Sequence, residues 1–159
     1  MNSLRLVSLL FLFIANCQQI QEQEQKPFVR IEHPISVDIE IGNKKVIELP
    51  FQVLYGYHIQ ADTVNDNNLI RAVLTFEQIE GIYIGTPAFP NFKKFQLNGT
   101  SEELLVFDGE LIVSVPISVH QSTKKGSYSL PGDLYYQACD SIRCLFPRRI
   151  KFQVVVNVH

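Results

Sequence analysis

The run "RIKFQVVVNVH" (Arg149–His159), the last in the sequence, decides the fold class. Its apolar residues recur at every second position. Because successive side chains of a β-strand point to opposite sides, this period of two predicts a strand with one continuous apolar face. That face carries Ile150, Phe152, Val154, Val156 and Val158. A strand of this kind needs a second apolar surface to cover it.

Runs of the same extended character recur upstream and would supply that surface. They cover residues 29–41, 44–55, 69–76 and 110–120. Turn-forming residues separate the runs: Gly42-Asn43, Asp66-Asn67-Asn68, Pro90-Asn91, Asn98-Gly99, Asp108-Gly109 and Pro131-Gly132-Asp133. The best helical candidate is "TSEELLVF" (100–107), which could open a single turn capped by Thr100 or Ser101. The pattern therefore predicts an all-β protein, an antiparallel immunoglobulin-like β-sandwich in a single domain.

The first residues predict export. The stretch "MNSLRLVSLLFLFIANC" has one Arg, a short apolar run and then Cys17, which is typical of a signal peptide. It resembles the lipobox of bacterial lipoproteins, although Asn16 stands where Gly, Ala or Ser is usual. We expect residues 1–16 to be the signal, Cys17 to be lipidated, and residues 17–27 to form a polar tether before a domain of residues 28–159. The alternative is an ordinary secreted protein that is cleaved nearby.

The composition fits one globular domain. The chain has 159 residues, a formal net charge of −2 and 46% hydrophobic residues, enough for a substantial core. Lys and Arg are not clustered as phosphate binding requires, so the sequence gives no sign of a nucleic-acid partner. No paired acids or phosphate-binding Gly-rich loop are found, and His58 is interpreted as a hydrogen-bonded histidine at a strand edge.

The stretch that carries chemistry is "YYQACDSIRCLFP" (Tyr135–Pro147), where four residues separate Cys139 from Cys144. A structural zinc site needs four ligands, and the scattered histidines do not complete one. A structural disulfide here would close a very small loop and restrain the unfolded chain little, by about 2 kcal/mol. A redox-active pair fits better, because such a loop can open without unfolding the sandwich. The staple remains an alternative at this point.

The charged neighbours of the cysteines bear on that redox interpretation. Arg143 favours the thiolate form of Cys144, and thiolate is the form that attacks and leaves in disulfide exchange. Asp140 works in the opposite direction beside Cys139, so the two sulfurs would be unequal.

The segment Tyr136–Pro147 resembles the active-site segment of the amino-terminal periplasmic domain of the bacterial thiol:disulfide interchange reductase DsbD. The stretches "GYHIQAD" (56–62) and "GTPAFPNFKKFQL" (85–97) resemble further parts of that domain in the same order. The resemblance implies an immunoglobulin-like domain whose pair, Cys139 and Cys144, relays reducing equivalents. It also implies that Tyr136 and Gln137 shape the preceding strand, and that Pro147 ends the loop.

The resemblance implies partners and a cover for the bridge. The partners would be thioredoxin-like or membrane-embedded redox proteins in the periplasm, and no cofactor is required. In the family, a cap loop with acidic and aromatic residues shields the disulfide. Here the matching segment is Pro90–Phe95, with Phe92 or Phe95 as the expected cap and lysines at 93 and 94. The membrane and thioredoxin domains of the family have no counterpart in the sequence. The competing interpretation is a non-catalytic immunoglobulin-like lipoprotein, a binding module with a small structural disulfide.

Overall fold

The computed structural model describes residues 27–31 and 35–159, which form twelve β-strands and no helix. The strands make three sheets of four. The first has the order β1 (Val29–Ile31), β3 (Lys44–Val53), β9 (Glu110–Val119) and β6 (Ile82–Ile84). The second has the order β2 (Ile35–Ile39), β12 (Arg148–Val158), β10 (Gly126–Tyr136) and β5 (Val73–Phe76). The third has the order β11 (Ala138–Cys139), β4 (His58–Gln60), β8 (Glu103–Phe107) and β7 (Lys93–Gln96).

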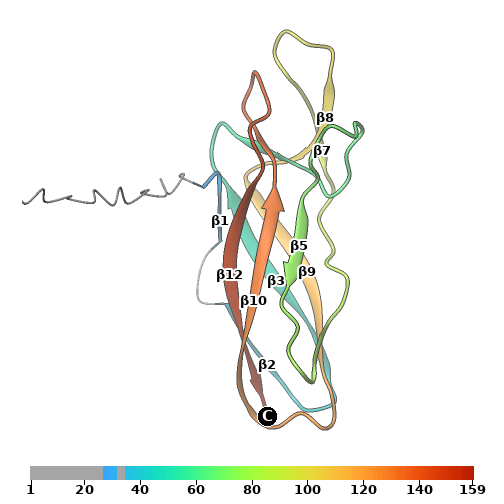
Figure 1. Cartoon of the computed structure of the whole chain (residues 1–159), viewed down its shortest axis with the longest axis vertical. Coiled ribbons are helices and arrows are strands. Elements are labelled where there is room, and N and C mark those ends of the chain that lie inside the picture. The colour runs from blue at the N-terminus through green and yellow to red at the C-terminus, as the bar shows by residue number, and fades with distance from the viewer. Residues whose placement is uncertain (1–26, 32–34) are drawn as a thin grey trace, which may run out of the picture.

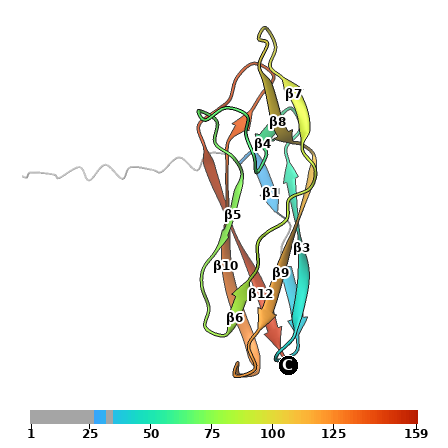
Figure 2. The ribbon, with the colours of Figure 1, turned by 90° about the vertical axis from the view of Figure 1, so that its right-hand side faces the viewer.

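The first two sheets form the two layers of a β-sandwich, seen edge-on in Figure 2. Alternate residues of the long strands β3, β9, β10 and β12 face inward and are buried, as the period of two requires. The rings of Phe51 on β3 and Phe152 on β12 meet edge to face between the layers, with centroids 5.5 Å apart. The all-β immunoglobulin-like sandwich is therefore confirmed.

The third sheet lies at one end of the elongated molecule, opposite the C-terminus (Figure 1). It is built largely from extensions of sandwich strands. β8 is joined to β9 through the Asp108-Gly109 turn, and β10 is followed after one residue by β11. The cysteine loop, residues 139–144, begins three residues after the end of β10, so this long sandwich strand determines where the loop lies.

Several of the strand predictions are confirmed. The runs at 44–55, 110–120 and 149–159 form β3, β9 and β12. Of the run at 69–76, only its last four residues form a strand, β5. The run at 29–41 is divided between β1 in the first sheet and β2 in the second.

Two local predictions and one detail of the topology are corrected. Residues 103–107 form strand β8, not the helical turn considered for this stretch, because they pair with both β4 and β7. Not all strand pairs are antiparallel, because β2 runs parallel to β12. Pro131-Gly132-Asp133 is not a turn but lies in the middle of β10.

Gly132 has a packing role in β10. A Cβ atom at this position would lie 2.6 Å from Cζ of Phe152 and 3.0 Å from Cδ1 of Phe76. The rings of Phe76 and Phe152 meet edge to face, with centroids 5.7 Å apart, over the backbone of Gly132. The Pro131 carbonyl accepts the N–H of Glu77, just beyond the end of β5. The Pro-Gly pair thus makes room for the aromatic rings rather than reversing the chain.

The predicted signal, the lipidation site Cys17 and most of the tether lie outside the described residues. Within residues 27–31 and 35–159, the structure contains no helix with the length and apolar character needed to span a membrane.

Candidate functional site

Cys139 and Cys144 form a disulfide at the end of the third sheet. Cys139 belongs to β11 and pairs with His58 of β4, and its Cα lies 3.9 Å from that of Cys144. The two cysteines also face each other as an antiparallel bridge, and the N–H of Leu145 donates to the carbonyl of Ala138 at 2.7 Å. The chain therefore reverses between the two sulfurs and returns alongside β11.

Asp140 builds that reversal. Its Oδ1 accepts the backbone N–H groups of Ile142 and Arg143, both at 2.8 Å. These hydrogen bonds are the main reason that the pKa of Asp140 is lowered from 3.8. The Arg143 carbonyl accepts the Asp140 N–H at 2.9 Å, and the Arg143 side chain is exposed. Asp140 thus holds the turn that brings the sulfurs together.

Gln137 and Tyr136 fix the approach to the loop. The Gln137 amide donates to the carbonyl of Leu145 at 3.1 Å and accepts the N–H of Ile70 at 2.9 Å. Tyr136 is fully buried, and its hydroxyl accepts the N–H of Phe28 at 3.1 Å. Burial raises the pKa of Tyr136 above its usual 10.0, although the backbone hydrogen bonds from Phe28 and Val29 act to lower it. Pro147, half-buried, stands immediately before β12, which begins at Arg148.

The two sulfurs are unequal in exposure. Cys139 has no exposed surface, whereas Cys144 is half-buried. Two large apolar side chains close to Cys144 in sequence face solvent: Ile142 is 68% and Phe146 is 91% exposed. A macromolecule that approaches the bridge would therefore meet Cys144 first, in apolar surroundings.

Gln60 contacts both sulfurs and was not among the residues selected from the sequence. Its Nε2 lies 3.2 Å from Sγ of Cys139 and 3.5 Å from Sγ of Cys144. Two polar residues among those described are buried: Gln60 has no exposed surface, and Thr123 has 8% of its surface exposed. The stretch "GYHIQAD" contains Gln60, but its contact with residues 79 and 84 positions away leaves no trace in local periodicity.

Beside Gln60, the same face of the third sheet carries His58, two residues earlier on β4. The His58 ring stacks on Phe95 of β7 with centroids 3.9 Å apart, and its Nε2 lies 3.9 Å from Oδ2 of Asp108. Asp108 also pairs with Lys93. Burial is the main cause that lowers the pKa of His58 from 6.5. The charge of Asp108 acts to raise this pKa, and the charge of Lys93 acts to lower it further.

The two expected cap residues differ in position. Phe95 is half-buried in a cluster that includes both cysteines. We call this the cysteine cluster: Leu69, Phe95, Leu97, Leu104, Val106, Cys139 and Cys144. Phe92 lies before β7, does not belong to the cluster and is 42% exposed. Lys94 of the same segment pairs with Glu103 at 2.8 Å.

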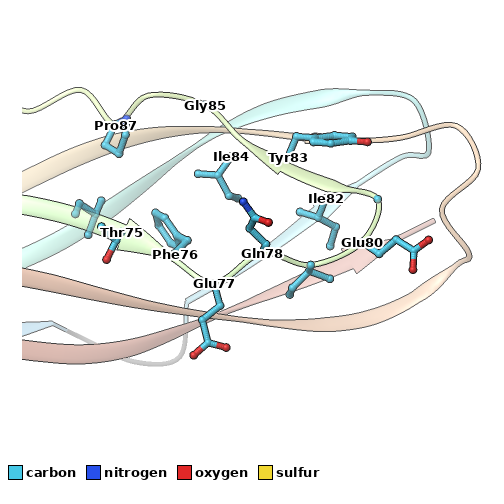
Figure 3. A pocket seen from close by; sticks show the side chains of 13 residues that line it. Thr75, Phe76, Glu77, Gln78, Glu80, Ile82, Tyr83, Ile84, Gly85 and Pro87 are labelled. Carbon is cyan, nitrogen blue, oxygen red and sulfur yellow. The ribbon is translucent and has the colours of Figure 1, made fainter.

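A groove of about 750 Å³ lies elsewhere, along the open edge between β5 and β6. Figure 3 shows the side chains that line it, among them Phe76, Ile82 and Tyr83. All of its lining residues fall between Leu74 and Pro87, so it includes none of the residues around the disulfide. Within residues 27–31 and 35–159, no three His, Cys, Asp or Glu side chains are grouped as metal ligands.

Fold and site together define an immunoglobulin-like β-sandwich with a loop disulfide at one end. No protein-family model and no curated protein matches the sequence. Among solved structures, the N-terminal periplasmic domain of ScsB from Proteus mirabilis matches with a TM-score of 0.50 and 12% identity. The match covers 81% of this chain and 44% of that chain. The reduced DsbD N-terminal domain of Neisseria meningitidis matches with a TM-score of 0.45 and 18% identity, over 69% and 76% of the two chains. The score with ScsB indicates a shared fold.

Proposed function

We propose that this protein is an exported thiol-disulfide exchange domain that passes reducing equivalents between redox proteins through Cys139 and Cys144. The observation that carries the proposal is the unequal burial of two bridged sulfurs in a small loop outside the sandwich core. A bridge whose purpose is to hold the fold together would join distant parts of the chain, because stabilisation grows with loop length.

Exchange would begin at Cys144, because a partner can reach the half-buried sulfur and not the buried one. A partner thiolate attacks Sγ of Cys144 and forms a new S–S bond, and the electron pair of the old bond leaves on Sγ of Cys139. A second partner thiolate then attacks the partner sulfur of this mixed disulfide and releases Cys144 as a thiolate. The partner dithiol becomes a disulfide, the pair here becomes a dithiol, and two protons pass with the two electrons.

The partners would be thioredoxin-like or membrane-embedded redox proteins, and we propose that they meet this domain outside the cytoplasm. The fold shared with a periplasmic domain of ScsB and the predicted signal of residues 1–16 support this location. Lipidation at Cys17 would hold the domain at a membrane surface, and Phe95 would cover the bridge until a partner displaces it. The resemblance of Tyr136–Pro147 to the DsbD segment supports the same type of partner.

The test is to trap the mixed disulfide. In Cys139→Ala, Cys144 has no resolving cysteine, so covalent complexes with thioredoxin-like proteins of the same cell envelope should accumulate and disappear on reduction. Cys144→Ala is the matched control, because its remaining sulfur is buried and should trap far less. Absence of any such complex with Cys139→Ala would overturn the proposal. It would favour a binding module with a structural bridge.

A further inference from the structure

We propose that Gln60 is a catalytic residue of the exchange, a side-chain amide that stabilises the sulfur released from the bridge. The inference rests on the proposed function and adds to it a group whose effect can be measured without any protein partner. Gln60 contacts both sulfurs, is completely buried and lies on β4, which pairs with β11 and β8.

The contacts place the amide at the bond that breaks. Nε2 lies 3.2 Å from Sγ of Cys139 and 3.5 Å from Sγ of Cys144. The shorter contact is with Cys139, the buried sulfur that would leave with the electron pair. A disulfide sulfur is a weak acceptor, whereas a thiolate carries a full charge and accepts a much stronger hydrogen bond. The interaction therefore strengthens as the S–S bond breaks, which is the requirement for catalysis.

The surroundings make this hydrogen bond important. The cysteine cluster supplies apolar side chains around Cys139, among them Val106 of the adjoining strand. A charge in such surroundings is costly unless it is hydrogen-bonded. Arg143, the cation next to Cys144 in sequence, is exposed and its backbone N–H is held by Asp140. Among the described residues, the Gln60 amide is the polar side chain within hydrogen-bonding distance of the buried sulfur.

The oxygen of the same amide also favours the reduced pair. Gln60 Oε1 is buried and accepts no hydrogen bond from the described residues. A buried acceptor without a donor destabilises the state in which it occurs. A disulfide has no S–H to offer, whereas a protonated cysteine does. Reduction thus gives Nε2 a better acceptor and creates S–H donors beside an amide whose oxygen has none, so Gln60 favours the dithiol over the disulfide.

The backbone of Gln60 holds the amide in place. The N–H of Gln60 donates to the carbonyl of Gln137 at 2.9 Å, and Gln60 pairs with Val106 of β8. β4 thus lies between β11 and β8 in the third sheet, with the side chain directed at the bridge. A donor fixed in this way needs little rearrangement when charge develops on the sulfur.

The experiment compares Gln60→Met with the unchanged protein in glutathione buffers that set the ratio of disulfide to dithiol. Methionine keeps the length and apolar stem of glutamine but has no N–H donor. We expect the rate of reduction to fall about 10- to 100-fold, because charge develops on the leaving sulfur and hydrogen bonds to charged groups are worth that much. The equilibrium constant for reduction should fall as well, because the disulfide accepts this hydrogen bond less well than the reduced sulfur does. Gln52→Met, an exposed site whose amide donates to the Val53 carbonyl, is the matched control and should change neither value more than about twofold.

A second measurement keeps the inference testable if Gln60→Met folds poorly. Gln60→Glu keeps the size of the side chain but places a carboxylate, which repels a thiolate, against the leaving sulfur. This variant should therefore favour the disulfide at least as strongly as Gln60→Met does. In a Cys144→Ala background, the ultraviolet absorbance of the Cys139 thiolate should appear at a higher pH when Gln60 is replaced. An unchanged equilibrium constant in folded Gln60→Met, or a shift toward the dithiol, would overturn the role of Gln60.

These outcomes separate the two proposals. If the glutathione equilibrium shifts as expected but no protein is trapped by Cys139→Ala, the exchange function fails and the chemistry of the amide stands. If partners are trapped but the Gln60 variants behave like the unchanged protein, only the role of Gln60 fails.

Discussion

Reduction of the disulfide should weaken the fold only slightly. The bridge closes a loop of six residues, since Cys139 and Cys144 are five positions apart. The chain-entropy relation gives about 2 kcal/mol for a loop of this size, against about 3 kcal/mol for fifteen residues. The large buried cluster between the first two sheets does not include either cysteine. We therefore expect the reduced protein to stay folded, with a free energy of unfolding lower by about 2 kcal/mol at most.

The assay is urea unfolding of the oxidised and the reduced protein, followed by far-ultraviolet circular dichroism. The midpoint should fall while the dependence on urea stays the same, because nearly the same surface is exposed in both cases. By linkage, 2 kcal/mol also means that the folded chain favours the disulfide about 30-fold more than the unfolded chain does. A reduced protein that is unfolded without urea would refute this reasoning. So would a loss of more than about 5 kcal/mol, the upper end for native disulfides, and either result would make the bridge a structural staple.

Three further predictions follow from single residues. Asp140→Ala removes the acceptor of two backbone N–H groups in the loop. Because the loss of a capping residue costs about 1 kcal/mol, the equilibrium in glutathione buffer should shift about fivefold toward the dithiol. A shift toward the disulfide would contradict the role of Asp140 in closing the turn. Gly132→Ala places a Cβ 2.6 Å from Phe152 Cζ and should destabilise the sandwich by about 1–3 kcal/mol in thermal unfolding; an unchanged midpoint would mean that the rings move freely. Because the pKa of His58 is lowered in the folded protein, the unfolded chain binds the proton more readily. The contribution of neutral His58 to the free energy of unfolding is complete above about pH 6.5 and is lost as the pH falls through the pKa of His58 in the folded protein. His58→Phe should flatten the pH dependence in that window, and an equal slope in both proteins would exclude His58 as its source.

The sandwich was largely predictable because its signal is local. In β3, β9 and β12, apolar residues at every second position are buried on one face, so a short window of sequence contains the information. The residues Glu103–Phe107 were harder, since a short apolar run after a capping motif is compatible with a helix or a strand. Pairing with β4 and β7 decides in favour of the strand, and neither partner is visible from the run itself.

The candidate site was predictable only in part for the same physical reason. The cysteines and Asp140 are neighbours in sequence, so the loop could be recognised from its residues. Gln60 reaches the sulfurs across 79 positions, and Phe95 enters the cysteine cluster through the pairing of β7 with β8. Such contacts depend on which strands share a sheet, and no local spacing encodes that. Gln60 resembles an ordinary strand residue until β11 is placed beside β4.

The two polar groups nearest the bridge should act in opposite directions, and this opposition distinguishes the site from a simple staple. Asp140 holds the turn that brings the sulfurs together and so favours the disulfide, whereas Gln60 offers a donor and an acceptor that the dithiol uses better. If both substitutions merely loosened the loop, they would shift the glutathione equilibrium in the same direction. Opposite shifts would mean that the geometry of the turn and the buried amide set the redox balance separately. Because both groups lie in or beside the third sheet, that balance can be tuned while the core between the first two sheets is preserved.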